Sequence, residues 1–447
     1  MNEHQKQSNK QTKLGMKMLK LFLNFLCSNM LNALIFLINA IWVGKLLGEN
    51  EVSVIANVAP IILVIASISA GYSTAVSVLV SKSSGAGEDE EVKNIMGFVY
   101  IFAFVVSISV SVLMIVLLPL LLRILNTPEI ILIDTSKYMY LYLISYIINF
   151  SLISFKSALK AIEKVKLTLG LTIVEVILNA IFVPLLIMQF GVFGAVLGNI
   201  SAKLLTLTLV IWINDERLKV TRNHLKIKAD YVKQFISIAS PITFDILMIG
   251  MLAMFETNIA NQSGVLGSAT IGVIDKLDEI VYIVSEPLQT VTMIIIAQYI
   301  GKKDKSKIKE VLSNSFKIAA AVMVFVAILI FVFPSQVSGL FIQSPTVIEM
   351  VVIYLLISGV GYVFLPIKQV LEGYLIAKEH SNYIFKAGIV GSIAEVVVIY
   401  VSIYNNVESI YALGIGTLSY VFTNIIIYIL YCLRDAKQNN QPLVNIN

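Results

Sequence analysis

The sequence predicts an all-α integral membrane protein whose twelve transmembrane helices form two pseudo-symmetric six-helix lobes around a central cavity. Apolar residues make up 57% of the 447 positions and charged residues only 14%, whereas soluble domains average about 45–50% and about 25%. The apolar residues gather in blocks of about 20 or more, the length that a helix needs to cross a bilayer. The second half of the chain repeats the pattern of the first, which predicts two lobes.

Apolar blocks between polar segments define the twelve spans. Those of the first half lie at 21–44, 53–80, 96–122, 138–159, 167–189 and 191–213. Those of the second half lie at 236–261, 268–297, 315–341, 350–376, 384–404 and 409–433. Several exceed the minimum length, which implies tilted helices. The chain therefore divides into an N-terminal tail (1–20), an N-terminal lobe (21–213), a linker (214–235), a C-terminal lobe (236–433) and a C-terminal tail (434–447).

Lysine and arginine residues predict which way the spans face, because they accumulate in cytoplasmic loops. The first 20 residues hold five lysines, the loop after the sixth span holds six basic residues, and 302–309 holds five more. The loops on the other side contribute only Lys45, Arg123 and Lys137. We therefore expect a multi-pass protein of the cell (plasma or inner) membrane with both termini in the cytoplasm.

The internal repeat has an offset of 216 residues. It aligns glycines in corresponding loops, Gly48 with Gly264 and Gly85 with Gly301, and it continues without gaps through two spans. Six spans per half return the chain to the side on which it began, so the two copies run in the same direction. Parallel repeats of this kind build transporters with a substrate path between two lobes.

Five segments carry a family resemblance: NAIWVGKLLG (39–48), VLVSKSSGAGEDEEVKN (78–94), VEVILNAIFVPLLI (174–187), FGVFGAVLGNISAKL (190–204) and IAQYIGKKDKSKIKE (296–310). Their order and spacing resemble the multidrug and toxin extrusion (MATE) transporters over nearly the whole chain. The resemblance implies alternating access that exports amphipathic, often cationic, compounds, with Na⁺ or H⁺ as coupling ion and no cofactor. Many relatives carry Asp where this chain has Asn39 and Val183, which argues against a proton relay in the N-terminal lobe.

Acidic residues within the spans are concentrated in the second half. A charge at mid-bilayer costs at least about 2.5–3.5 kcal/mol, so an acid there faces a cavity or a partner. Carboxylates are hard oxygen ligands suited to Na⁺, and they also exchange protons. The resemblance implies a cation site at Glu256 and Asp278, where Na⁺ would bind, and the neighbouring Glu286 and Asp275 are further candidates for ion coupling. Alternatively, some of these acids, Asp275 and Glu256 among them, lie at the extracellular rim in water.

Polar and aromatic side chains are candidates for lining the substrate cavity. We select Asn32, Phe36, Asn39, Tyr72, Asp245 and Tyr282. Aromatic rings attract flat organic cations by stacking and cation–π contact, and asparagine hydrogen-bonds to a ligand or between helices. For each asparagine and aromatic residue, packing between helices is the alternative role.

These features predict a secondary active antiporter for small organic cations that works as a monomer in the lipid bilayer. The alternative is a lipid-linked oligosaccharide or lipid flippase, which shares the twelve-span repeat but needs basic residues in its cavity. Lysines well inside the spans are few (Lys203, Lys276 and Lys368) and acids outnumber them, which favours a cationic substrate. The sequence lacks Walker, HExxH, GxSxG and CxxC motifs, which argues against an enzyme or a required ATPase subunit. The basic residues lie in short loops, so we do not expect a nucleic-acid partner.

Overall fold

The computed structural model describes residues 3–125, 127–213 and 215–438. The side chains of residues 3–12, 36, 40, 49–50, 56 and 436–438 lie outside this description. Within the described residues, twelve helices are long and apolar enough to cross a membrane, which confirms the predicted fold class and number of spans. Helices satisfy every main-chain group internally, as a chain in lipid requires.

The helices of the first half follow one another with short connections. They are α1 (Glu3–Leu46), α2 (Glu49–Ala86), α3 (Asp89–Ile124), α4 (Glu129–Ala161), α5 (Val165–Phe190) and α6 (Val192–Ile213). Residues 3–20, predicted as a separate tail, are helical and continuous with α1. This segment contains no proline and is rich in lysine, glutamine, leucine and methionine, which all favour helix.

The second half begins after a 3-10 turn at Arg222–His224. Its helices are α7 (Ala229–Asn261), α8 (Gly264–Gly301), α9 (Ser306–Ala327), α10 (Pro334–Gly339), α11 (Pro345–Ala377), α12 (Ser381–Tyr404) and α13 (Ser409–Gln438). A π-type turn, Ile328–Val332, extends α9. The ninth span thus ends before residue 341, the predicted limit, because Pro334 lacks an N–H and its ring blocks the preceding turn.

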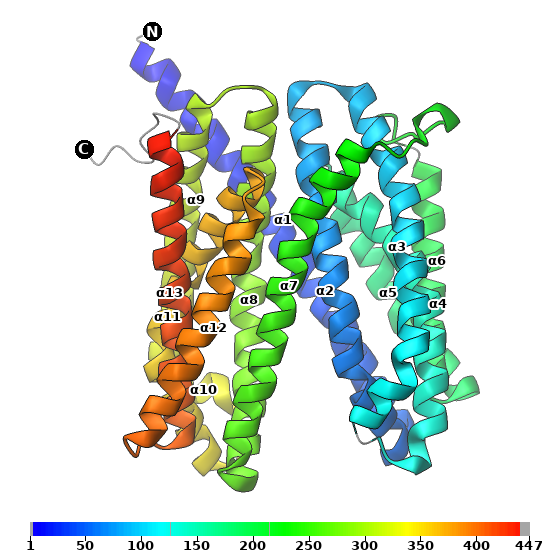
Figure 1. Ribbon diagram of the computed structural model, residues 1–447, viewed down its shortest axis with the longest axis vertical. Helices are drawn as coiled ribbons and strands as arrows, with labels where there is room; N and C mark the ends of the chain where they lie inside the picture. The colour runs from blue at the N-terminus through cyan, green and yellow to red at the C-terminus, as the bar shows by residue number, and fades with distance from the viewer. Residues whose placement is uncertain (1–2, 126, 214, 439–447) are drawn as a thin grey trace. The chain divides into compact units, whose positions relative to one another are not determined.

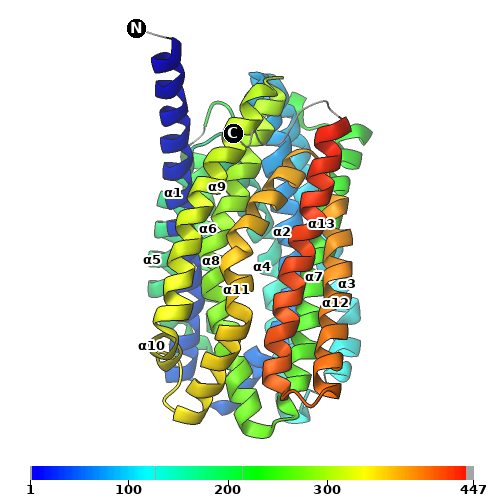
Figure 2. The ribbon, with the colours of Figure 1, turned by 90° about the vertical axis from the view of Figure 1, so that its left-hand side faces the viewer.

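The chain forms two compact units. The N-terminal unit is Asn24–Ala239, and the C-terminal unit combines Met1–Leu23 with Ser240–Asn447. In the N-terminal unit α2 packs on α3 and α4, and α5 packs on α6. In the C-terminal unit α8 packs on α11, while α12 and α13 run side by side (orange and red in Figures 1 and 2).

The internal repeat is visible in the helix bounds. Helices α4 and α11 each contain 33 residues, and both bounds differ by 216 (129 against 345, 161 against 377). Each helix is followed by a glutamate in the left-handed region, Glu163 with φ 63° and Glu379 with φ 61°. The same pattern of main-chain hydrogen bonds closes both helix ends, as in the Schellman motif. The repeat therefore extends to the backbone conformation of the connections.

The connection between α6 and α7 is fixed to the first turns of α3. Three contacts hold it: Arg217 Nη2 lies 2.8 Å from Asp89, His224 Nε2 lies 3.2 Å from Glu90, and the Tyr231 hydroxyl donates to Glu91 at 2.6 Å. The His224 carbonyl oxygen lies 2.1 Å from where Gly97 would carry a Cβ. A side chain larger than hydrogen at position 97 would therefore push this connection away from α3.

Candidate functional site

Three helices of the C-terminal unit bring two carboxyl groups and a hydroxyl together. Glu256 lies near the end of α7, and Glu395 of α12 is in hydrogen-bonding contact with it. Thr417 of α13 donates to Glu256 Oε1 at 3.5 Å. Two carboxylates in contact repel each other strongly in a low-dielectric interior. A proton on Glu256 that is donated to Glu395, or a bound cation, removes this repulsion.

A chain of hydroxyl groups leads from this pair to Asp278 on α8. The Tyr354 hydroxyl lies 2.9 Å from Thr417 Oγ1 and 3.2 Å from the Tyr362 hydroxyl. Tyr362 in turn donates to Asp278, whose Oδ1 is buried without a hydrogen-bond partner. The structure thus places Glu256 and Asp278 in one polar network, together with two tyrosines of α11.

The electrostatics of this network favour a bound cation. In the described part of the chain, no lysine, arginine or histidine forms an ion pair with Glu256, Asp278 or Glu395. Nor do the described residues contain a group of three His, Cys, Asp or Glu side chains placed to hold a metal ion. A monovalent cation here would therefore combine carboxylate oxygens with hydroxyl oxygens of Thr417 and the tyrosines.

The other predicted coupling residues lie on either side of Asp278 along α8. Asp275 is exposed, one turn before it, and its charge reaches Glu256. Glu286 lies two turns beyond, about 12 Å away at the helical rise of about 1.5 Å per residue, and accepts a hydrogen bond from Thr290 at 2.6 Å. The structure therefore groups Asp275 with the network and separates Glu286 from it.

A second cluster of charged residues is buried in the C-terminal unit. Lys368 of α11 pairs with Glu372 at 2.6 Å, and both side chains are buried. Gln289 Nε2 donates to Glu372 at 3.0 Å and the Tyr428 hydroxyl donates at 2.9 Å. Asp245 of α7 is only 7% exposed and lies within electrostatic reach of both Lys368 and Glu372.

Comparison with known proteins identifies the family. The MatE family profile matches residues 25–185 and 231–401. The chain belongs to the MatE family. Two Bacillus subtilis relatives are "Probable multidrug resistance protein YoeA", 21% identical over 359 residues and 78% of each chain, and "Probable multidrug resistance protein YpnP", 24% identical over 364 residues, 80% of this chain and 81% of that one.

Solved MATE structures share the fold over almost the whole chain. A mutant of the Vibrio cholerae MATE transporter VcmN gives a TM-score of 0.89 at 18% identity, covering 96% of this chain and 98% of that chain. A Pyrococcus furiosus transporter of the MOP superfamily, described as having a binding pocket of reversed polarity, gives 0.85 at 17% identity, covering 95% of each. At these identities the likeness shows the MATE fold alone.

The predicted cavity residues of this MATE protein lie in different environments. Tyr72 is buried, donates to the Val99 carbonyl oxygen at 2.9 Å and lies 2.8 Å from Ser154 Oγ, so it packs α2 against α3 and α4. Tyr282 is 50% exposed. Asn32 is exposed and Asn39 is half-buried, with a buried Oδ1 that has no partner. The side chain of Phe36 lies outside the described residues.

The N-terminal unit holds an ion pair that the sequence did not predict. Lys156 of α4 pairs with Glu175 of α5 and donates to Thr172 Oγ1 at 3.4 Å. Lys203 of α6 lies within electrostatic reach of both. Lys156 lies inside the predicted span 138–159, and a lysine within an apolar span was the sequence feature that could have indicated this pair. Glu395 and Thr417 were also not selected, because only the packing of α7, α12 and α13 shows that they meet.

Proposed function

We propose that this MATE transporter exports amphipathic, mainly cationic organic compounds in exchange for Na⁺ or H⁺ by alternating access. The observation that carries the proposal is the network of Glu256, Glu395 and Asp278, which is linked by hydroxyl groups and has no basic partner among the described residues. The coupling ion binds at Glu256 and Asp278. The names of the curated relatives, which refer to multidrug resistance, support this substrate class.

The coupling ion and a cationic substrate both bind to the negative charge of Glu256 in this network. Occupation of Glu256 by a proton or by Na⁺ neutralises the charge that it would otherwise offer to a cationic substrate. A substrate that needs this charge therefore binds when the ion has left, and a returning ion displaces it. Reciprocal weakening of this kind is the linkage that an exchanger requires.

The arrangement in the membrane is part of the proposal. We place both termini in the cytoplasm, because the basic residues of the N-terminal segment and of the α6–α7 and α8–α9 connections belong on that side. The end of α7 near Glu256 then faces the extracellular side. The protein works as a monomer, without an ATPase subunit.

A flippase for lipid-linked oligosaccharides is the second candidate. Lys156 and Lys203 of the N-terminal unit favour it, because half-buried lysines on membrane-spanning helices suit an anionic lipid headgroup. Lys156, however, is already paired with Glu175, whereas the acids of the C-terminal network have no basic partner in the described chain. The carboxylates therefore favour a cationic substrate.

The test uses purified protein in liposomes and an ethidium-like dye. We expect efflux that stops when the gradient of the coupling ion is collapsed, with the sodium and pH gradients collapsed separately. Glu256→Gln should abolish this efflux, because it keeps the volume and removes both the charge and the titratable proton. Glu349→Gln is the matched control, since Glu349 is exposed on α11 and outside the network. Efflux that survives loss of both gradients, or that persists in Glu256→Gln, would contradict the proposal.

A further inference from the structure

One face of α12 links the two charged clusters of the C-terminal unit. Gly388, Gly391, Ser392 and Glu395 follow at spacings of three, one and three residues, which places them on the same face of a helix. From Gly388 to Glu395 the helix rises by about 10 Å. Glu395 lies at the Glu256 network, and Gly388 lies at Asp245.

The two glycines on this face make room for polar side chains of α7 and α13. Asp245 Oδ1 lies 2.1 Å from where Gly388 would carry a Cβ, and Asn424 Nδ2 lies 2.4 Å from the corresponding position at Gly391. Any side chain larger than hydrogen would displace these groups. At both glycines the atom nearest to α12 is thus a polar one.

Three buried oxygens along this face have no hydrogen-bond partner in the described structure. They are Asp245 Oδ1, Asn424 Oδ1 and Ser392 Oγ, on side chains that are 7%, 0% and 8% exposed. Buried polar atoms are rarely left unpaired, and three of them along one helix face would be satisfied together by a bound ion or water. Carboxylate, amide and hydroxyl oxygens are the ligands that hard cations prefer.

The charge balance at Asp245 indicates a single positive charge. The charge of Lys368 acts on Asp245, but the Lys368 ammonium is bound to Glu372, which also receives hydrogen bonds from Gln289 and Tyr428. The other titratable groups that face Asp245 are Tyr282 of α8 and Tyr420 and Tyr428 of α13, which are neutral when protonated. Two carboxylates against one ammonium leave one negative charge, which one monovalent cation would balance.

We propose that Asp245, Ser392 and Asn424 form a second site for the coupling ion, a proton or Na⁺, which exchanges with the Glu256 network along the α12 face. The proposal rests on the proposed function. In the orientation proposed above, Asp245 is the cytoplasmic site and Glu256 the extracellular one. The ion thus moves between the two sites along the α12 face, within the C-terminal unit.

The test counts bound ions on the full-length protein in detergent, without substrate. Radioactive Na⁺ measures sodium, and a pH-indicator dye in weakly buffered solution measures protons. Wild type should bind two ions and Asp245→Asn one. Ser392→Ala should keep two ions, with the affinity of one lowered roughly two- to tenfold, the effect of one lost polar contact. Asp230→Asn is the matched control, on the exposed first turn of α7.

The possible results separate the two proposals. The second site is overturned if Asp245→Asn binds as many ions as wild type. It is also overturned if Ser392→Ala binds both ions with the affinity of wild type, and this second variant keeps the test valid should Asp245→Asn misfold. If wild type binds a single ion that Glu256→Gln removes, the proposed function stands without the second site. If Glu256→Gln leaves ion binding and gradient-driven efflux unchanged, the Glu256 site itself is contradicted, whatever Asp245→Asn shows.

Discussion

Glu256 and Asp278 lie at opposite ends of one hydrogen-bonded network, in which Thr417, Tyr354 and Tyr362 are the intermediate groups. Hydroxyl groups both donate and accept, so a change of charge at one carboxyl reorients the donors that reach the other. The two acids should therefore respond to the coupling ion as a unit rather than as separate sites.

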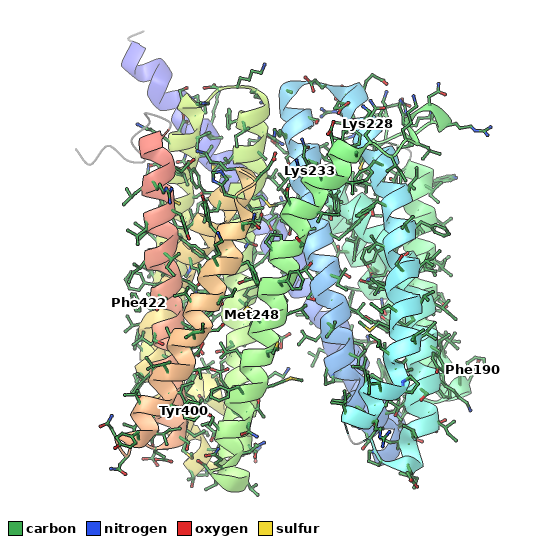
Figure 3. All side chains as sticks on the ribbon, in the orientation of Figure 1. Phe190, Lys228, Lys233, Met248, Tyr400 and Phe422 are labelled. Atoms are coloured by element: carbon green, nitrogen blue, oxygen red, sulfur yellow. The ribbon has the colours of Figure 1, made fainter. Side chains whose placement is uncertain are left out.

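Tyr354→Phe tests this connection, because it removes the central hydroxyl and keeps the ring. We expect the ion concentration for half-maximal efflux to rise roughly two- to tenfold, as the loss of one hydrogen-bonding group implies, with little change in thermal stability. Tyr400→Phe is the control, since Tyr400 is 56% exposed on α12, where Figure 3 labels it. Unchanged ion dependence in Tyr354→Phe would separate Glu256 from Asp278.

Glu395→Gln, combined with Glu256→Gln, tests whether the carboxyl pair shares its ion. Residues in contact show non-additive effects in double-mutant cycles. We expect each single change to weaken ion binding strongly, and the double change to add little to the loss in Glu256→Gln. The measurement is ion binding to the purified variants. Two additive losses would show that Glu395 binds independently.

Asn39→Ala should affect transport only mildly. Asparagine carries no titratable proton, and Asn39 Oδ1 has no hydrogen-bond partner in the described structure. Removal of the Asn39 amide therefore deletes few hydrogen bonds, each with a net value of about 0.5–1.5 kcal/mol. The rate of dye efflux, compared with wild type at matched expression, measures the loss of transport. Complete loss of ion coupling would show that the N-terminal unit holds an essential ion site.

The sequence predicted the features that depend on one helix at a time. The number of spans, the repeat and the acids on α7 and α8 follow from composition and spacing. Contacts between helices do not, because the identity of the neighbour depends on packing. Glu256 meets Glu395 across 139 positions of sequence and Thr417 across 161, and no periodicity within α7 indicates either partner. The buried state of Tyr72 was likewise not decidable from its place in an apolar span.

The ion pair of Lys156 and Glu175 should be structural. The two side chains are 16% and 7% exposed, and removing one partner of a buried pair costs about 3–5 kcal/mol because the other charge is left uncompensated. We expect Lys156→Met to lower the melting temperature in detergent markedly, and Lys156→Met with Glu175→Leu to recover most of it. A single variant as stable as wild type would indicate that Glu175 has another positive partner.

Gly97→Ala should loosen the connection between α6 and α7 from α3. A Cβ at position 97 would lie 2.1 Å from the His224 carbonyl oxygen and 2.6 Å from its carbon, and these are main-chain atoms that no side-chain rotation can move. The connection must shift as a whole, at a cost of about 1–3 kcal/mol typical of overpacking, and its contacts with Asp89, Glu90 and Glu91 should weaken.

Gly170→Ala is the matched control. Gly170 lies on α5, where a Cβ meets nothing within 4 Å, and replacing a helical glycine by alanine stabilises the fold by about 0.5–1 kcal/mol. Limited proteolysis at Arg217 and Lys219, together with the melting temperature, measures both effects: Gly97→Ala should be cut faster and melt lower, and Gly170→Ala should do neither. Equal protection of the two variants would mean that the connection does not pack closely on Gly97.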